Sequence, residues 1–407
     1  MALLVQKYGG TSVADPDRIQ NVARLVKRAV DEGHQVAVVV SAMAGTTNQL
    51  VNWVDEIDAG HFDPAEYDTV VAAGEQVTSG LLAIALNKQG VRARSFQGWQ
   101  IPLLTEGGHA KARIGSIPAD NLKRALDEGQ VAVISGFQGI SEAGRIATLG
   151  RGGSDTSAVA IAAVLGAERC DIYTDVDGVY TTDPRIHEKA QKIDRITYEE
   201  MLELASLGAK VLQTRSVAVA MQHRVRVQVL SSFEDKPGTL VVGEDEIMES
   251  NIVTGIAHSR DEAKITLAGV NDKPGVAAGI FGPLAEANIN VDMIVQSVSS
   301  DGATTSMTFT VGKADLIRAK ALLDSLKSSV GIERVDADGN VVKISVVGVG
   351  MRSHAGVAHT MFRTLSERGI NIQAISTSEI KVSVLIASDY MELAIRSLHA
   401  AYGLDAS

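Results

Sequence analysis

Residues 150–176 read GRGGSDTSAVAIAAVLGAERCDIYTDV, and this stretch decides the class of fold. It begins with a glycine loop, which is followed by Ser154 and Asp155, two residue types that start helices. The alanine-rich run behind them predicts a helix, and residues 170–176 predict a strand. A loop, a helix and a strand in this order form the building unit of an α/β fold.

The same alternation of strand and helix patterns extends outward over the N-terminal half of the chain. Continuous apolar runs predict buried strands at 35–40 and 130–136. A helical pattern follows Asp15-Pro16, a pair that commonly opens a helix. Uninterrupted apolar strands between helices indicate a largely parallel sheet that is covered on both faces. We therefore expect an α/β fold whose mainly parallel sheet is sandwiched by helices.

The C-terminal part of the chain contains an internal repeat. The segment KITLAGVNDKPGVAAGIFGPLAEANINV starts at Lys264, and KISVVGVGMRSHAGVAHTMFRTLSERGINI starts at Lys343. Each copy predicts a strand, a glycine turn, a helix and two further strands. Two structural duplicates without a ligand are the simpler interpretation, but paired small α+β units often form binding sites where they meet. The acidic, turn-rich stretch 231–250 suits the boundary before them.

Composition excludes several classes of partner. The formal net charge of -11 argues against nucleic acid and anionic membranes, because both require a basic surface. Cys170 is the single cysteine, so no internal disulfide can form, and its apolar surroundings favour burial over reactivity. No apolar run reaches the roughly 18 residues of a membrane span. We expect a cytoplasmic enzyme or sensor.

Lys7 ends the first predicted strand within the motif KYGGTSV. In an open α/β sheet, ligands bind off the carboxyl ends of the strands. Gly9 and Gly10 allow a ligand to approach the backbone, and a cation beside exposed N–H groups suits phosphate. An ordinary glycine turn with a solvated lysine is the alternative.

Arg151 lies between glycines at the start of the predicted helix of residues 154–168. Its guanidinium suits a carboxylate or a phosphate, and the positive end of the helix faces the same place. Asp155 is too acidic for a pure anion site, so it either orients a lysine or an amino group, or it caps the helix. Taken together, residues 151–155 favour a functional site over a simple helix start.

Three further motifs follow predicted strands or open helices. Ser41 and Thr47 lie in SAMAGTTNQL, for which a capped helix start is the simpler interpretation. Glu75 lies among apolar residues and either caps a helix or receives an ammonium group. The block YTDVDGVYTTDPRI, residues 173–186, has polar side chains that suit an adenine and its phosphates. Its Asp-x-Asp-Gly lacks the closing glutamate of a calcium loop, and turn chemistry alone explains Asp-Gly and Asp-Pro.

These motifs combine cations with glycine loops, and no Cys/His cluster has the spacing of metal ligands. No G-x-S-x-G motif of an α/β-hydrolase is present. Phosphoryl transfer depends mainly on charged groups held in the right positions and needs little covalent chemistry from the protein. Cations beside glycine loops fit this reaction.

Taken together, the motifs resemble the aspartate kinases of the amino-acid kinase superfamily, which carry a C-terminal pair of ACT domains. The resemblance covers essentially the whole chain and rests on KYGGTSV, SAMAGTTN, AAGEQ, LGRGGSDTSA, YTDVDGVYTTDPR, GAKVL, DKPG…NINVDMI and ISTSEIKVSVLI. It implies a catalytic domain at 1–245 and two βαββαβ, ferredoxin-like ACT regions at 246–340 and 341–407. It also implies MgATP-dependent phosphorylation of the L-aspartate side chain, the first step toward lysine, threonine, methionine and isoleucine.

The resemblance assigns roles by motif. Catalytic roles fall to Lys7, Arg151 and Asp155, with no residue assigned as a metal ligand. The implied nucleotide-binding residues are Lys7, Tyr8, Gly9, Gly10, Ser41, Thr174, Asp175, Tyr180, Arg185, Lys210 and Val211. The implied substrate-binding residues are Thr47, Glu75, Arg151, Gly152, Gly153 and Ser154. Arg151 would clamp the α-carboxylate of aspartate, and Glu75 would receive its ammonium group.

The resemblance also implies feedback inhibition by lysine and threonine at the ACT regions. The implied effector residues are Asp272, Gly275, Val276, Asn290, Val291, Asp292, Gln296, Asn371, Ile372, Ser376, Thr377 and Glu379. Family members associate through these regions, so we expect a homo-oligomer or pairing with a shorter regulatory subunit, which in relatives arises from an internal start near Met248. The alternatives are a kinase of glutamate or an N-acetylated amino acid, which Glu75 and Arg151 disfavour, and an inactive amino-acid sensor, which intact Lys7, Arg151 and Asp155 disfavour.

Overall fold

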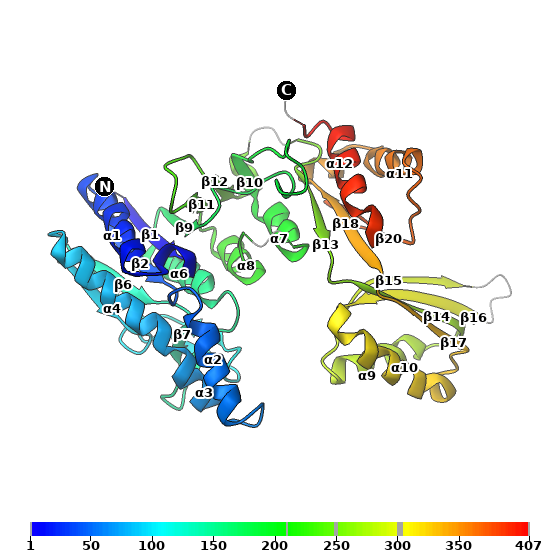
Figure 1. Ribbon diagram of the computed structural model, residues 1–407, viewed down its shortest axis with the longest axis horizontal. Helices are drawn as coiled ribbons and strands as arrows, with labels where there is room; N and C mark the ends of the chain where they lie inside the picture. The colour runs from blue at the N-terminus through cyan, green and yellow to red at the C-terminus, as the bar shows by residue number, and fades with distance from the viewer. Residues whose placement is uncertain (1, 209–210, 248–250, 299–303, 406–407) are drawn as a thin grey trace. The chain divides into compact units, whose positions relative to one another are not determined.

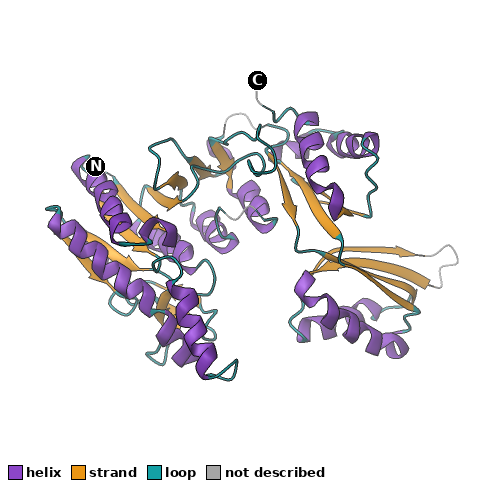
Figure 2. Cartoon of the chain, viewed as in Figure 1, coloured by secondary structure: helices purple, strands orange, loops and turns teal. Residues whose placement is uncertain are grey.

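The computed structural model describes residues 2–208, 211–247, 251–298 and 304–405, which fold into two compact units. The first unit holds the described residues up to Val179, then Lys192–Ala205 and 211–247. The second holds Tyr180–Gln191 and the C-terminal repeats. Figure 1 colours the chain by residue number, and Figure 2 colours helices and strands.

A large sheet forms the centre of the first unit. Its strands are β1 (Leu3–Tyr8), β2 (Gln35–Val40), β3 (Ala93–Phe96), β6 (Val131–Ser135), β9 (Arg169–Thr174), β10 (Arg195–Thr197), β11 (Val227–Ser231) and β12 (Thr239–Val242). Their order is β10-β12-β11-β9-β1-β2-β6-β3, and every neighbouring pair is parallel except β11 with β12. The mainly parallel sheet expected from the apolar runs is confirmed.

Helices cover both faces of this sheet. Helices α1 (Pro16–Asp31) and α4 (Ala73–Lys88) pack on the face that presents Val36, Val38 and Val40. Helices α5 (Asp120–Asp127) and α6 (Gly153–Leu165) contact the same strands, and α8 (Thr214–His223) packs on α6. The remaining helices are α2 (Thr46–Ile57), α3 (Pro64–Val71) and α7 (Tyr198–Ser206). As expected, Asp15 caps α1, because its Oδ1 accepts the N–H of Arg18 at 2.8 Å.

The helical stretch Pro64–Lys88 is long and apolar enough to cross a membrane by length and mean hydropathy alone. However, 56% of the residues in its most apolar window are buried inside the fold. The stretch is therefore best explained as a core helix, interrupted at Ala72 between α3 and α4.

A second, smaller sheet in the first unit was not predicted from the sequence. Its strands are β4 (Leu104–Glu106), β5 (Arg113–Ser116), β7 (Gln138–Ile140) and β8 (Ile146–Thr148), in the order β5-β4-β7-β8. Each strand has only three or four residues, which is too short to show a periodic pattern. This sheet matters for the site, because β8 leads directly into the glycine loop around Arg151.

The second unit contains the two copies of the repeat. The first copy consists of β14 (Ala263–Asn271), α9 (Val276–Glu286), β15 (Val291–Val298), β16 (Thr304–Val311), α10 (Leu316–Val330) and β17 (Arg334–Asp338). The second consists of β18 (Val341–Val347), α11 (Val357–Glu367), β19 (Ala374–Thr377), β20 (Lys381–Ala387) and α12 (Met391–Ala401). The described residues of the second copy thus end on a helix where the first copy adds a strand.

The missing strand comes from the segment before the first copy. β13 (Gly255–Ser259) pairs antiparallel with β18, so the second sheet runs β13-β18-β20-β19. The first sheet runs β17-β14-β16-β15, in which β17 takes the matching edge. An open edge at β18 would leave backbone groups unpaired, and β13 satisfies them. The expected region 246–340 therefore contributes a strand to each sheet, and a boundary at 340–341 does not separate the two folds.

Candidate active site and effector cavity

Lys7 and Asp155 meet at the carboxyl edge of the large sheet. Lys7 stands near the end of β1, between Val39 of β2 and Ile172 of β9. Its Nζ lies 2.6 Å from Oδ1 of Asp155, which belongs to the first turn of α6. Both residues are only 8% exposed, so the pair is well shielded from water. The structure therefore brings together the cation of the first glycine motif and the carboxylate of the second.

Other atoms of the protein lie close to the backbone of Gly9 and Gly10, which follow Lys7 and Tyr8. A Cβ on Gly9 would lie 3.4 Å from the Lys7 Nζ, and one on Gly10 would lie 3.0 Å from the carbonyl oxygen of Ala42. The N–H of Gly9 donates to the carbonyl of Tyr173 at 3.2 Å, so it is not free for a ligand. A side chain at Gly10 would press on the Ala42 carbonyl, whereas a Cβ at Gly9 would make ordinary contact with the Lys7 side chain.

The Tyr8 side chain does not face the site. Its ring is fully buried and stacks on Tyr173 with the ring centroids 4.6 Å apart. Burial, followed by the neighbouring Tyr173 hydroxyl and the charge of Asp171, raises the pKa of Tyr8 well above its ordinary value. The side chain of Tyr8 is therefore turned into the core, and the implied role of Tyr8 in nucleotide binding stays a prediction for its main chain.

Arg151 is carried by a tight loop between β8 and α6. Gly150 and Gly152 have φ angles of 76° and 75°, in the left-handed region that favours glycine. Arg151 is exposed, and among the residues that the structure describes no carboxylate pairs with its guanidinium. Gly153 begins α6, and Ser154 is buried there. The loop thus presents a cation next to the positive end of a buried helix.

Glu75 is a buried carboxylate with spare hydrogen-bonding capacity. It lies in the first turn of α4 and is 3% exposed. Its Oε1 accepts the N–H of Ala42 at 3.1 Å, while Oε2 has no hydrogen-bond partner within the described part of the chain. Burial raises the pKa of Glu75 to about 7, against the lowering effect of the Ala42 N–H. The contact with Ala42 places Glu75 beside the loop that holds Ser41 and leads into α2, which begins with Thr46 and Thr47; Ser41 and Thr47 are both half-buried.

The implied nucleotide-binding residues are divided between the two units. Thr174 ends β9 and donates its hydroxyl hydrogen to Oδ1 of Asp175 at 3.1 Å. Val211 is half-buried in the first unit, and Lys210 lies outside the described residues, as does Met248. Tyr180 and Arg185 belong to the second unit.

Arg185 is largely exposed and already has an internal partner. Its guanidinium contacts both carboxylate oxygens of Asp183, at 3.0 Å and 2.8 Å. The hydrogen bond from Arg185 holds the pKa of Asp183 below its ordinary value. A phosphate would have to compete with this carboxylate for the guanidinium.

The segment Tyr180–Gln191 carries a cluster that the sequence did not reveal. Asp405 Oδ1 lies 2.7 Å from Nε2 of His187 and 2.6 Å from Nδ1 of His399, and Thr181 Oγ1 lies 2.8 Å from Nε2 of His399. Hydrogen bonds from the two histidines lower the pKa of Asp405 to about 2. The members come from distant parts of the chain, so no local spacing could indicate them. These contacts attach the segment to α12 of the second copy.

A cavity of about 420 Å³ lies at the start of α9 in the first copy. It is lined by Asp272, Lys273, Pro274, Gly275, Val276, Ala277, Gln296 and Met307. Four of the implied effector residues therefore share one cavity, although they come from a loop, a helix and β15. A second cavity of about 410 Å³, between β3 and α5, contains none of the implied site residues.

The other implied effector residues lie elsewhere on the two copies. Asp292 on β15 is bound by Lys343 of β18, with Nζ 2.6 Å from Oδ2. Burial lowers the pKa of Lys343, but the hydrogen bonds that its ammonium donates to Asp292 and Glu262 outweigh this and raise the pKa overall. An ammonium group of an effector would have to displace Lys343. Oε2 of Glu379 lies 3.6 Å from Nε of Arg352. The remaining residues are exposed or half-buried, namely Asn290, Val291, Asn371, Ile372, Ser376 and Thr377.

Comparisons with known proteins agree with this architecture. A family model described as the amino acid kinase family matches residues 2–231, and one described as the ACT domain matches residues 265–325 and 344–402. The aspartate kinase Ask_LysC of Stutzerimonas stutzeri is 54% identical to this chain over 407 residues, covering 100% of this chain and 98% of the relative.

Two solved structures are similar over nearly their full length. The E. coli aspartokinase III in complex with aspartate and ADP aligns with a TM-score of 0.81 at 29% identity, covering 98% of this chain and 99% of the other. The same enzyme in complex with lysine and aspartate aligns with a TM-score of 0.78 at 30% identity, with the same coverage.

Proposed function

The chain belongs to the amino acid kinase family, among its aspartate kinases with ACT domains, and we propose that the residues around Lys7 carry out its reaction. The enzyme uses ATP to phosphorylate the side-chain carboxylate of L-aspartate, which gives 4-phospho-L-aspartate. This is the first step toward lysine, threonine, methionine and isoleucine. The contact of Lys7 with Asp155 at the carboxyl edge of the sheet carries the assignment of residues.

The chemistry requires little from side chains beyond charge. An oxygen of the aspartate side chain bonds to the γ-phosphorus of ATP while the bond from this phosphorus to the bridging oxygen breaks, and ADP leaves. The side-chain carboxylate is already ionised near neutral pH, so no general base is needed. The barrier lies in bringing two anions together, and Lys7 lowers it by offsetting the charge on the transferred group. Asp155 holds the Lys7 ammonium in place.

Arg151 and Glu75 hold the amino-acid part of aspartate. The exposed guanidinium of Arg151 takes the α-carboxylate as a bidentate pair, with Gly152, Gly153, Ser154 and Thr47 beside it. Oε2 of Glu75, which has no hydrogen-bond partner among the described residues, receives the α-ammonium. A buried oxygen without a partner is costly, and a bound ammonium removes that cost.

The pH dependence of aspartate use tests this role of Glu75. With a pKa of about 7 in the free enzyme, Glu75 is mostly protonated below pH 7 and ionised above it. Only the ionised form attracts ammonium, so kcat/KM for aspartate should rise about tenfold per pH unit below the pKa and level off above it. Initial rates at saturating ATP, measured from roughly pH 5.5 to 8.5, check this expectation.

The matched variant is Glu75→Gln, which keeps the shape of the side chain and removes its ionisation. It should have a lower kcat/KM for aspartate and no rise near pH 7. A variant whose profile still rises in this range would show that another group titrates there.

ATP binds along the ends of β1 and β9 in this proposal, through Gly10, Ser41, Thr174, Asp175 and Val211. The resemblance also assigns Lys210, Tyr180 and Arg185 to the nucleotide. Mg²⁺ would bind together with the nucleotide, as is usual for sites to which the protein supplies few ligands. The carboxylate that contacts Lys7 is already engaged, which fits an ion held mostly by its phosphates. Bound Mg²⁺ supplies further positive charge on the β- and γ-phosphates.

Lysine and threonine inhibit the enzyme by binding to the ACT copies. The cavity at the start of α9 offers the carboxylate of Asp272, the amide of Gln296 and the first N–H groups of a helix, which together suit an amino acid. Asp292, Asn290, Val291 and the residues of the second copy complete the effector-binding surface. The enzyme works in the cytoplasm as a homo-oligomer, or with a shorter regulatory subunit, associated through these copies.

Replacing Asp272 with alanine should weaken effector binding. Loss of a charge-assisted contact with an effector ammonium raises the inhibitory concentration about 10- to 100-fold. Inhibition curves for lysine, threonine and their mixture check this, each scaled to the uninhibited rate of the same variant. Glu286→Ala is the control, because Glu286 is exposed at the far end of α9, roughly 16 Å along the helix. Equal inhibition of the Asp272 variant and the unmodified enzyme would place the effector elsewhere.

The acceptor itself is tested by trapping the acyl phosphate with hydroxylamine. Hydroxamate should form with aspartate and not with glutamate or N-acetylated amino acids, because an acetylated nitrogen has no charge for Glu75. Product from glutamate alone would overturn the aspartate assignment, and no product from any acceptor would favour a sensor.

A further inference from the structure

Asp68 is a buried charge to which the proposed mechanism gives no role. It lies in α3, and it is 0% exposed. A carboxylate in such a place is costly unless hydrogen bonds saturate its oxygens. Its partners therefore indicate what it holds together.

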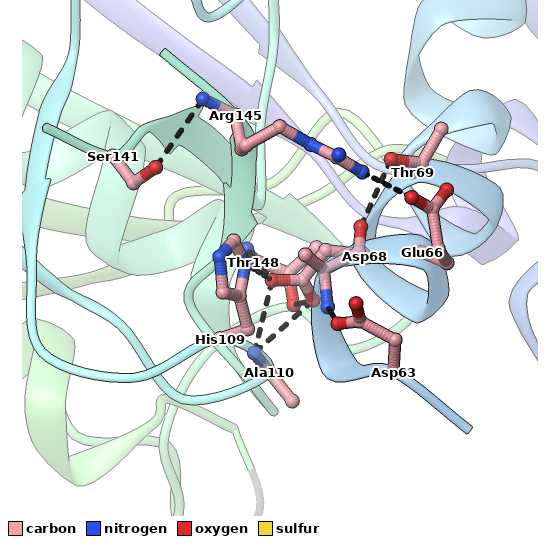
Figure 3. Close-up of polar contacts among 10 residues, drawn as sticks. Asp63, Glu66, Asp68, Thr69, His109, Ala110, Ser141, Arg145 and Thr148 are labelled. Carbon is pink, nitrogen blue, oxygen red and sulfur yellow. Dashed lines mark hydrogen bonds and ion pairs between the residues drawn. The ribbon is translucent and has the colours of Figure 1, made fainter. Parts of the chain in front are cut away.

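Figure 3 shows these partners around the carboxylate. Asp68 accepts the N–H of Ala110 at 3.1 Å and 3.0 Å, and the N–H of Thr148 at 3.0 Å. The Thr148 hydroxyl also donates to it, and Nδ1 of His109 lies 2.8 Å from Oδ2. One side chain of α3 thus binds two separate backbone segments, at 109–110 and at 148.

The second of these segments leads to the substrate loop. Thr148 is fully buried at the end of β8, and only Leu149 and Gly150 separate it from Arg151. The carbonyl of Thr148 accepts the N–H of Ala112 at 2.9 Å, so both backbone groups of Thr148 are fixed. Beyond it, the N–H of Gly153 donates to the carbonyl of Gly150 at 3.0 Å, so the turn that carries Arg151 is itself closed and its orientation follows from how its two ends are held.

Arg215 anchors the same strands from α8. Its Nη1 donates to the carbonyl of Leu149 at 2.8 Å, and its Nη2 donates to the carbonyl of Ala112 at 2.9 Å. The N–H of Leu149 donates to the carbonyl of Phe137 at 2.9 Å. The entry to the Arg151 loop is therefore held by Asp68 at Thr148 and by Arg215 at Leu149.

We propose that Asp68 is a positioning residue for aspartate binding, which acts through Thr148 to fix the loop that presents Arg151. The inference rests on the proposed role of Arg151. Since Arg151 has no carboxylate partner in the described part of the chain, the direction of its side chain depends on its backbone. A loop that is free to shift would bind the α-carboxylate of aspartate less tightly, while the affinity for ATP would not change.

A nearby surface contact offers a matched control. Glu66 lies on α3 two residues before Asp68, and its Oε1 lies 2.6 Å from Nη2 of Arg145, which immediately precedes β8. This exposed pair joins the same two elements as the buried contacts. Exposed pairs of this kind contribute little to stability. Glu66→Gln therefore shows whether losing any contact between α3 and β8 changes KM for aspartate, or only the loss of the buried ones.

The main experiment compares Thr148→Val with Thr148→Ser. Valine keeps the size of the side chain but removes the hydroxyl donor to Asp68, whereas serine keeps the donor. We expect Thr148→Val to raise KM for aspartate about 3- to 10-fold, with kcat and KM for ATP changed less than about twofold. Serine should restore KM, and Glu66→Gln should leave it unchanged. Asp68→Asn should have a larger effect of the same kind.

A merely structural role predicts a different pattern. In that case the variants lose thermal stability while KM for aspartate stays constant, or all kinetic constants change together. Either pattern overturns the proposal, and melting curves taken on the same samples of the full-length enzyme identify it. If Asp68→Asn does not fold, the comparison of Thr148→Val with Thr148→Ser still tests the proposal.

A double variant separates this inference from the role of Arg151 itself. If Arg151→Ala leaves KM for aspartate unchanged, the proposed role of Arg151 fails, and this inference fails with it. If Arg151→Ala raises KM and Thr148→Val does not, only the role of Asp68 fails. If both raise KM, adding Thr148→Val to Arg151→Ala should have no further effect, because both changes act through one contact.

Discussion

Replacing Lys7 with methionine is expected to lower kcat by about 10²- to 10³-fold, the usual effect of removing one group that stabilises the transition state. The Lys7 ammonium is buried beside Asp155 and faces the transferred phosphoryl group in the proposed mechanism. The charge it offsets grows as the two anions approach, so its effect belongs to the transition state more than to the bound substrates. KM for ATP and KM for aspartate should therefore change much less than kcat.

Two companion variants make the Lys7 result interpretable. Lys27→Met removes an exposed lysine from α1, where its partner is Asp31, and should leave kcat unchanged. Lys7→Met leaves the Asp155 carboxylate buried without its partner, which destabilises the fold. Lys7→Met combined with Asp155→Asn removes that unpaired charge, and it should regain stability without regaining rate. A normal kcat for Lys7→Met alone would show that the transferred phosphate does not bind beside Lys7 at the end of β1.

The parts of the site that follow strand ends were predictable from the sequence. Lys7 follows an apolar run, and Asp155 opens an alanine-rich helix, so each was placed at the edge of a parallel sheet by local pattern. The rule that ligands bind at carboxyl strand ends placed both residues near one edge, but it left open whether Asp155 contacts a lysine or caps the helix. Alternating strand and helix patterns gave the α/β class, and two similar segments of sequence gave the repeat in the second unit.

Contacts between distant segments were not predictable. Asp68 looks like an ordinary polar residue of an amphipathic helix, and its partners at Ala110 and Thr148 belong to strands and turns too short for a pattern. The strand β13 was missed for a related reason, since nothing local shows that its edge pairs with β18. Lys343 was known as the start of a repeat, but its contact with Asp292 depends on how the two copies pack.

Motif membership did not indicate which way the Tyr8 side chain points. Tyr8 lies within a glycine-rich motif that favours ligand contact, yet the alternation of a strand turns its side chain into the core, where it stacks on Tyr173. Because Lys7 and Tyr8 are neighbours on one strand, they point to opposite faces. Motif membership therefore identifies the ligand-binding edge without saying which side chains reach it.

Replacing Arg151 with alanine is expected to raise KM for aspartate about 30- to 100-fold, which corresponds to the loss of about 2 to 3 kcal/mol of charge-assisted hydrogen bonding. The α-carboxylate contact exists both in the bound substrate and in the transition state, so kcat should fall much less than kcat/KM. Lys7→Met has the opposite pattern, which separates the residue that holds aspartate from the residue that assists transfer.

Arg151→Lys distinguishes geometry from charge. Lysine keeps the charge but loses the planar fork that matches a carboxylate, so it should recover only part of the affinity for aspartate. Arg145→Ala is the control, because Arg145 is another exposed arginine of the same sheet region and its partner Glu66 lies on the surface. KM for ATP should stay constant throughout. A rise in KM for ATP with no change for aspartate would instead place Arg151 on the phosphates, and the loop held by Asp68 and Arg215 would then serve the nucleotide.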